Sequence, residues 1–250
     1  MTEQIHNSCV HDFEQLLQYV AENKIALTPK QSLIPLRHIK TVMQRFQIQE
    51  SHEHCIGDRA YKTRDEMEYP RFYFLDLLAI GGRLLKITGK NLLAKGPNWE
   101  TFFAAEQRER GFLIFHAFRY GFNIENWLLR GGDFGAQLEE KAEMIWPRIL
   151  DWRDGNRVEW KSWSQGLIRD CGVHWNSIDQ THAEDLAIWG LEYCFVKPLE
   201  YMGLLEVERE GKAFSRLRSI QLNQIGCNLF ARLLTKSGQF IAAISPYSLN

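Results

Sequence analysis

The sequence predicts a mainly α-helical chain with small β-hairpins, which belongs to the α+β class. Apolar residues recur at helical spacing in several segments, and short apolar strands lie between glycine-containing turns. A third observation is a recurring unit, in which an apolar helix precedes a short strand that ends in a Leu-Thr-like pair, and a Gly or Lys then opens another helix. The unit lies at residues 72–93 and 187–234, with a fainter copy at 13–46. Such recurrence indicates a modular scaffold.

The composition is that of a globular protein. The 250 residues are 45% hydrophobic and 24% charged, with a formal net charge of -1. No apolar run reaches the roughly 18 residues that span a bilayer, and no signal peptide opens the chain, so we expect a cytoplasmic protein with no membrane partner. The low net charge argues against a strongly electrostatic nucleic-acid binder, although it leaves room for a local patch. Five dispersed cysteines predict reduced thiols: Cys9, Cys55, Cys171, Cys194 and Cys227.

An N-terminal helical unit is expected over residues 1–68. Its expected elements are a helix over 11–23, a strand over 25–27, an amphipathic helix over 36–46 and a polar linker or surface loop over 51–69. Thr28-Pro29 is a signal for a helix start or a turn, because proline is tolerated where the first backbone N–H has no helical partner.

A middle unit is expected over residues 69–130. Its expected elements are a helix over 71–80, a glycine stop at 81–82, a strand over 84–87 and a helix over 99–120. Thr88-Gly89-Lys90 is expected to begin another helix. Residues 130–135 predict a flexible break and the boundary of this unit.

The last unit, residues 131–250, joins a tryptophan-rich segment to a hairpin. Its expected elements are a helix over 136–152, an irregular stretch over 154–179, a helix over 181–202 bent near Pro198, two strands over 204–208 and 217–222, a helix over 227–234 and a closing strand over 240–244.

This last unit resembles the winged-helix pattern, in which a helix ends at a Gly-Leu pair, a two-stranded wing follows, and a Leu-Thr-x-x-Gly-like turn returns the chain to a helix. Met-Gly-Leu-Leu at 202–205 and Leu-Asn-Gln-Ile-Gly at 222–226 carry the match, with Asn223 in the place of Thr; both residues can cap a helix. Residues 80–90 look like a shortened version, and residues 27–30 keep only its turn. The chain is also similar to uncharacterised bacterial proteins that contain such units in tandem. The resemblance implies a binding module for DNA or for another protein.

The best candidate binding surface is the basic side of the helix over 36–46. Residues 24–49 contain five Lys or Arg and no Asp or Glu, so a phosphate backbone could be met there without repulsion. The residues expected to contact nucleic acid are Lys30, Arg37, Lys40 and Arg45. An ordinary solvated helix face has the same pattern, so both interpretations stay open.

Two other functions are weighed. A protein-interaction scaffold could use the tryptophan-rich segment, with Trp163 and Trp175 as anchors. A metal-dependent enzyme is the weaker alternative, because the His and Cys groups at 6–11, 52–55 and 171–174 have no second half at a zinc-binding spacing. Phosphate-loop and hydrolase motifs are missing from the sequence. We therefore expect no catalytic residue, no metal and no cofactor.

Overall fold

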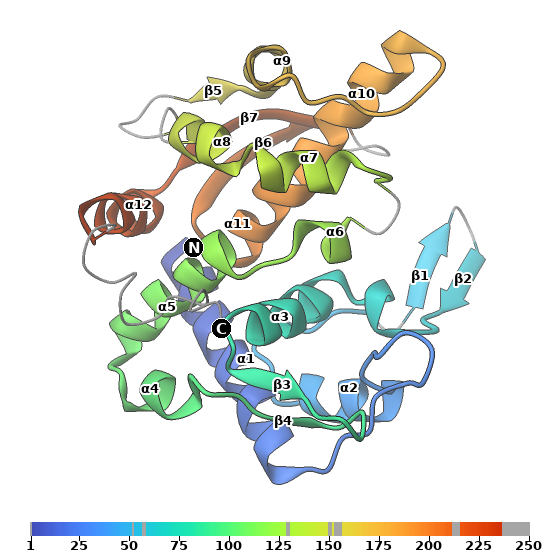
Figure 1. Ribbon diagram of the computed structural model, residues 1–250, viewed down its shortest axis with the longest axis vertical. Helices are drawn as coiled ribbons and strands as arrows, with labels where there is room; N and C mark the ends of the chain where they lie inside the picture. Colours follow the sequence, from blue (N-terminus) through green and yellow to red (C-terminus); the bar gives the residue numbers. More distant parts are fainter. Residues whose placement is uncertain are drawn as a thin grey trace.

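Figure 1 shows the computed structural model, which describes residues 2–51, 53–56, 59–128, 131–149, 152, 157–211 and 216–236. The chain is mainly helical with small antiparallel sheets, so the predicted α+β class is confirmed. In the view of Figure 1 an N-terminal unit lies below and a C-terminal unit lies above.

The N-terminal unit packs three helices on a small sheet. Its elements are α1 (Thr2–Glu22), a short segment at 25–27, α2 (Leu36–Met43), α3 (Pro70–Gly81), β3 (Leu85–Ile87) and β4 (Leu93–Lys95). β3 and β4 pair antiparallel, and Ala26 bridges Leu92 beside β4. The sheet therefore has the order 25–27, β4, β3, and its inner face buries Leu85 and Leu93.

The C-terminal unit has the same order of elements. It contains α8 (Ala142–Ile149), β5 (Val158–Glu159), α9 (Trp160–Cys171), α10 (Gln180–Leu191), the π-helical turn η3 (Glu192–Val196), α11 (Lys197–Tyr201), β6 (Leu205–Glu210) and β7 (Arg216–Leu222). Its strand order is β5-β7-β6. Both units thus run helix, strand, helix, helix, strand, strand, and in both the first strand pairs with the last.

Further elements connect the two units. They are the hairpin β1 (Glu53–Ile56) and β2 (Arg59–Lys62), the turn η1 (Glu66–Glu68), and the helices α4 (Trp99–Ala104), α5 (Gln107–Tyr120), α6 (Ile124–Trp127), α7 (Phe134–Glu140) and α12 (Gln224–Lys236). α12 packs on α5, where the rings of Phe115 and Phe230 lie 4.7 Å apart. One continuous hydrophobic core links the units.

α3 lies at the centre of this core. It begins at Pro70, where the missing N–H costs nothing, and ends at Gly81 and Gly82 as the sequence predicts. Phe72, Phe74 and other side chains around the helix are fully buried, so it has no open face for a ligand. Each such burial contributes on the order of 2 kcal/mol to stability.

Residues 13–46 and 72–93 are not independent copies of one unit. They lie in the same N-terminal unit, joined by the Ala26–Leu92 bridge and by packing of α1 on α3. The divisions at residues 68 and 130 stay predictions. What the sequence shows as three unequal repeats is, in the described part of the chain, one arrangement of helices and strands that occurs twice.

Several expected elements are wrong. Thr88-Gly89-Lys90 forms a turn between β3 and β4 and begins no helix. The helix expected over 99–120 is interrupted because Ala105 is extended. The stretch 154–179 contains α9, and the expected linker 51–69 contains a hairpin, because strands of two to four residues show no readable period.

The remaining expectations agree with the structure or lie outside it. The hairpin β6–β7 and the last helix are confirmed, while residues 240–244 are not among the described residues. No described helix is long and apolar enough to cross a membrane. The thiols of Cys9, Cys171, Cys194 and Cys227 are free, and the Cys55 side chain lies outside the described set.

Candidate functional site

Two similar turns lie next to each other in the N-terminal unit. Leu27-Thr28-Pro29-Lys30 and Ile87-Thr88-Gly89-Lys90 share the pattern of an aliphatic residue, a threonine, a turn residue and a lysine. The Oγ1 atom of Thr28 accepts the N–H of Leu33 at 3.0 Å, and that of Thr88 accepts the N–H of Leu92 at 3.3 Å. Each threonine thereby closes its own loop, as threonine side chains do in turns.

Asn91 holds these two turns together. Its backbone C=O accepts the N–H of Leu27 at 3.0 Å, and its side-chain amide donates to the C=O of the same residue at 3.2 Å. Asn91 also has a φ of 54°, a conformation that asparagine tolerates better than most residues. The hydrogen bonds therefore present Lys30 and Lys90 from adjoining loops.

The small sheet adds two more lysines on its outer face. The register pairs Lys86 with Ala94, and the bridge between Ala26 and Leu92, continued by two residues, places Lys24 on the other side of Ala94. We call Lys24, Lys30, Lys86 and Lys90 the twin-turn surface. All four side chains are exposed, and none of them forms an ion pair with a described residue.

The charge of the chain is strongly segregated around this surface. Residues 24–49 and 77–99 contain nine Lys or Arg and no Asp or Glu. Removing these nine from the 30 basic residues of the chain leaves 21 against 31 acidic ones, so the rest of the chain is markedly negative. The overall charge of -1 therefore conceals a basic region, because it averages two oppositely charged parts.

The predicted contact residues separate into three groups. Lys30 belongs to the twin-turn surface. Arg37 and Lys40 are exposed on the outer face of α2, whose Ile39 is buried as the periodicity predicts. Arg45 pairs with Glu22 at 2.8 Å and lies over the Tyr19 ring, so part of its charge is already used.

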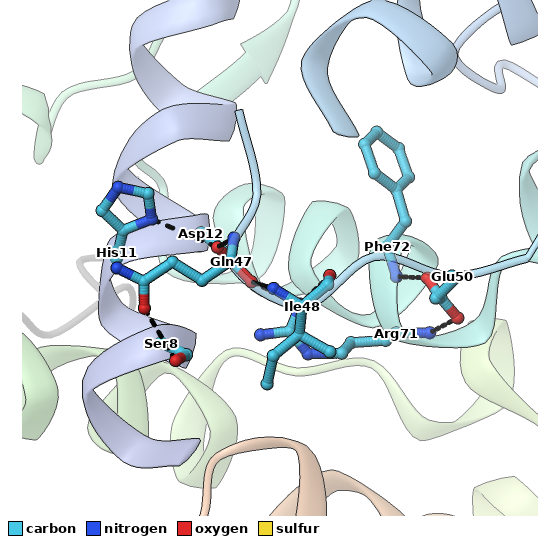
Figure 2. A network of polar contacts seen from close by, with 8 residues as sticks. All are labelled: Ser8, His11, Asp12, Gln47, Ile48, Glu50, Arg71 and Phe72. Carbon is cyan, nitrogen blue, oxygen red and sulfur yellow. Dashed lines mark hydrogen bonds and ion pairs between the residues drawn. The ribbon is translucent and has the colours of Figure 1, made fainter. Parts of the chain in front are cut away.

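A buried polar network fixes the chain that leaves α2 (Figure 2). The Asp12 carboxylate accepts the N–H groups of Gln47 at 2.6 Å and Ile48 at 3.2 Å, and it pairs with the Arg71 guanidinium at 2.7 Å. The Glu50 carboxylate accepts the first backbone N–H groups of α3. Because these bonds join α1, α3 and the segment between them, they hold the basic elements on a rigid support.

A buried pair of carboxyl groups, Glu66 and Asp76, lies between η1 and α3. Glu66 accepts the N–H of Ile34 at 2.5 Å. Burial, and then the Asp76 charge, raise the pKa of Glu66 well above its ordinary value, while burial raises the pKa of Asp76 to about 6. Each carboxyl has one buried oxygen without a donor when both are ionised, and one shared proton supplies the missing hydrogen bond. The pair is part of the core, with Glu66 fully buried.

The hairpin of the C-terminal unit is a poor phosphate binder. Arg209 pairs with Glu192 at 2.7 Å and Glu200 at 2.8 Å, and Arg218 pairs with Glu208 at 3.2 Å. Because carboxylates neutralise these arginines, the charge balance that the sequence shows at this hairpin persists in the fold.

The predicted aromatic anchors are less exposed than another tryptophan. Trp163 is half-buried and stacks on Trp160 at 5.5 Å, and Trp175 is half-buried against Phe134. Trp189 is 46% exposed. The sequence gives no sign of this difference, because all these residues lie in one tryptophan-rich segment.

The lysines of β3 and its turn are the residues that sequence reasoning missed. Their signal was available, since residues 77–99 contain four basic and no acidic residues. Within the described part of the chain, no three His, Cys, Asp or Glu side chains are grouped so that they could hold a metal ion. The group at 52–55 lies outside the described side chains.

Comparison of the chain with protein-family models, curated proteins and solved structures finds no match.

Proposed function

We propose that this protein binds nucleic acid through phosphate contacts made by the twin-turn surface. The observation that carries the proposal is the joining of two acid-free segments, 24–49 and 77–99, by the Ala26–Leu92 bridge and the Asn91 hydrogen bonds. Lysines gathered without neutralising carboxylates repel one another, and a polyanion relieves this repulsion while releasing its own counterions.

We also propose that both units are winged-helix-like. The support is the repeated order of helix, strand, helix, helix, strand, strand, with the β6–β7 hairpin in the position of a wing. The third helix of the N-terminal unit, α3, is buried and would not enter a groove. Base edges would then go unread, since phosphate contacts position a protein and base contacts specify sequence. We therefore expect binding with little sequence preference.

The test is fluorescence anisotropy with a labelled DNA duplex of mixed sequence, titrated at several salt concentrations. If four lysines meet phosphates, the slope of log K against log salt is about -4. Lys86→Gln combined with Lys90→Gln should make this slope about 2 units shallower and should weaken binding.

The matched control is Lys161→Gln combined with Arg169→Gln. These residues are exposed on α9, and the change in net charge is the same. The control should leave the slope unchanged. Failure of the wild-type protein to bind DNA at low salt, or equal losses in both double variants, would contradict the proposal.

Arg37→Gln combined with Lys40→Gln measures how much the outer face of α2 contributes. A loss close to that of the Lys86 and Lys90 variant would extend the binding surface to α2. An unchanged slope would confine it to the twin-turn surface.

A further inference from the structure

Arginine repeatedly docks on this fold in one manner. In α5, Glu109 and Phe112 lie three residues apart, so both face the same way on the helix. Arg232 of α12 lies 3.9 Å from the centre of the Phe112 ring and pairs with the Glu109 carboxylate at 2.5 Å. The guanidinium thus combines a cation–π contact with an ion pair, which suits its flat, forked shape.

Two other helices use the same arrangement. Arg119 lies 5.1 Å from the Trp146 ring and pairs with Glu143, and Arg45 lies 5.2 Å from the Tyr19 ring and pairs with Glu22. In every case the ring and the carboxylate belong to one helix, three residues apart, and the arginine comes from another part of the chain. An aromatic residue and a carboxylate one turn apart therefore form a receptor for arginine in this fold.

α10 carries the same receptor at the surface. Trp189 is 46% exposed, and Asp185, four residues earlier, is exposed on the same side of the helix. Tyr193, four residues later, stacks on the Trp189 ring at 5.2 Å with 22° between the planes. Because Tyr193 covers the face toward the C-terminal turn, the opposite face of the ring is directed toward the turn that carries Asp185.

This receptor has no arginine of its own within the described residues. None of the described Arg or Lys side chains lies over the Trp189 ring, and Asp185 forms no ion pair with a described residue. Trp175 touches Trp189 at 66°, against its edge. The ring is also rigidly backed, since Tyr193 stacks on the buried Trp127 at 4.8 Å, and Trp127 Nε1–H donates to the Tyr193 C=O at 2.8 Å.

We infer that Trp189 and Asp185 bind an arginine side chain of a partner protein. The charge around them selects this occupant, because Glu184 and Asp179 are also exposed on this part of the chain and would repel a phosphate backbone. The preformed stack lowers the entropy lost when the guanidinium binds. α10 extends to the upper edge of the molecule in Figure 1. This surface belongs to the C-terminal unit and is separate from the twin-turn surface.

The experiment follows the Trp189 indole N–H by two-dimensional NMR of the full chain, with the signal assigned through Trp189→Phe. Three blocked pentapeptides serve as probes: one central arginine, one central lysine, and one central citrulline, which keeps the planar shape without the charge. The arginine peptide should shift the Trp189 signal saturably, with lysine weaker and citrulline without effect. Asp185→Asn should weaken arginine binding about two- to fivefold, the value expected for an exposed charge pair.

Glu100→Gln is the matched control, since Glu100 is an exposed carboxylate on α4. It should leave the arginine affinity unchanged, and the other indole signals should show that each variant is folded. An unmoved Trp189 signal, an equal response to citrulline, or an Asp185→Asn variant that binds as well as the wild type would overturn the inference. A Trp189 shift on adding a DNA oligonucleotide in place of the arginine peptide would overturn it in favour of base stacking.

Discussion

The buried pair of Glu66 and Asp76 predicts an unusual dependence of stability on pH. In the folded chain the pKa of Asp76 is about 6, compared with an ordinary value of 3.8, and that of Glu66 is also raised. The folded state therefore keeps protons that the unfolded chain has released, so this pair lowers stability as pH rises. The Asp76 shift of about two pKa units corresponds to about 3 kcal/mol of stability lost between pH 4 and 6.

The perturbation is Glu66→Gln. A glutamine at this position can accept the N–H of Ile34 with its carbonyl and donate to Asp76 with its amide, so the hydrogen bonds survive without a titrating proton. The variant should equal the wild type near pH 5. At higher pH the ratio of the two unfolding equilibrium constants should change roughly tenfold per pH unit in favour of the variant, until Glu66 ionises in the wild type.

The assay is urea unfolding from pH 5 to 8, with the difference between variant and wild type plotted against pH. Taking the difference removes the contribution of histidines such as His6, whose pKa is lowered mainly by burial and which makes stability rise with pH in both proteins. Glu100→Gln, on the exposed face of α4, should run parallel to the wild type. A constant difference between Glu66→Gln and wild type over this range would refute the shared proton.

Two packing predictions concern the frame that holds the twin-turn surface. Asp12→Asn leaves a buried guanidinium unpaired and should lower the free energy of unfolding by about 3–5 kcal/mol, whereas Glu22→Gln, in an exposed pair, should cost less than about 1 kcal/mol in the same urea titration. Gly81→Ala would place a Cβ 2.2 Å from the Gly121 C=O oxygen and should destabilise by about 1–3 kcal/mol in thermal unfolding, but Gly89→Ala, with no atom within 4 Å, should change stability by no more than about 1 kcal/mol; equal effects at both glycines would contradict this reading of the contact.

Sequence reasoning succeeds where one segment contains its own signal. The amphipathic period of α2 identifies Ile39 as buried and Arg37 as exposed, and the glycines after α3 mark its end. α1 begins near residue 2, well before the expected start at 11, because its first turns are polar yet pack on the C-terminal unit, where His6 Nδ1 bonds the Met202 C=O at 2.9 Å. Such a contact joins residues 196 positions apart and leaves no local pattern.

The twin-turn surface shows the same limit more sharply. The basic run at 24–49 was visible in the sequence and was assigned to a helix face, because helices are where a charge pattern can be read. The turn at Thr88 was predicted to open a helix, since three-residue strands on either side have no period. Only the pairing of Ala26 with Leu92 brings the two basic runs together. The chemistry was therefore readable from the sequence, but its location was not.

The two proposed surfaces make separate electrostatic demands on one chain. A uniformly basic protein would hold phosphates but would repel an arginine-bearing partner, and a uniformly acidic one would do the reverse. Segregating the charge satisfies both, because interactions between exposed charges are largely screened beyond about 8–10 Å at physiological salt. Asp185→Asn should therefore leave the salt slope of DNA binding unchanged, and the Lys86 and Lys90 double variant should leave the Trp189 shift unchanged. If either variant alters both readouts, the two surfaces are coupled and the net charge of the chain, rather than its local arrangement, governs binding.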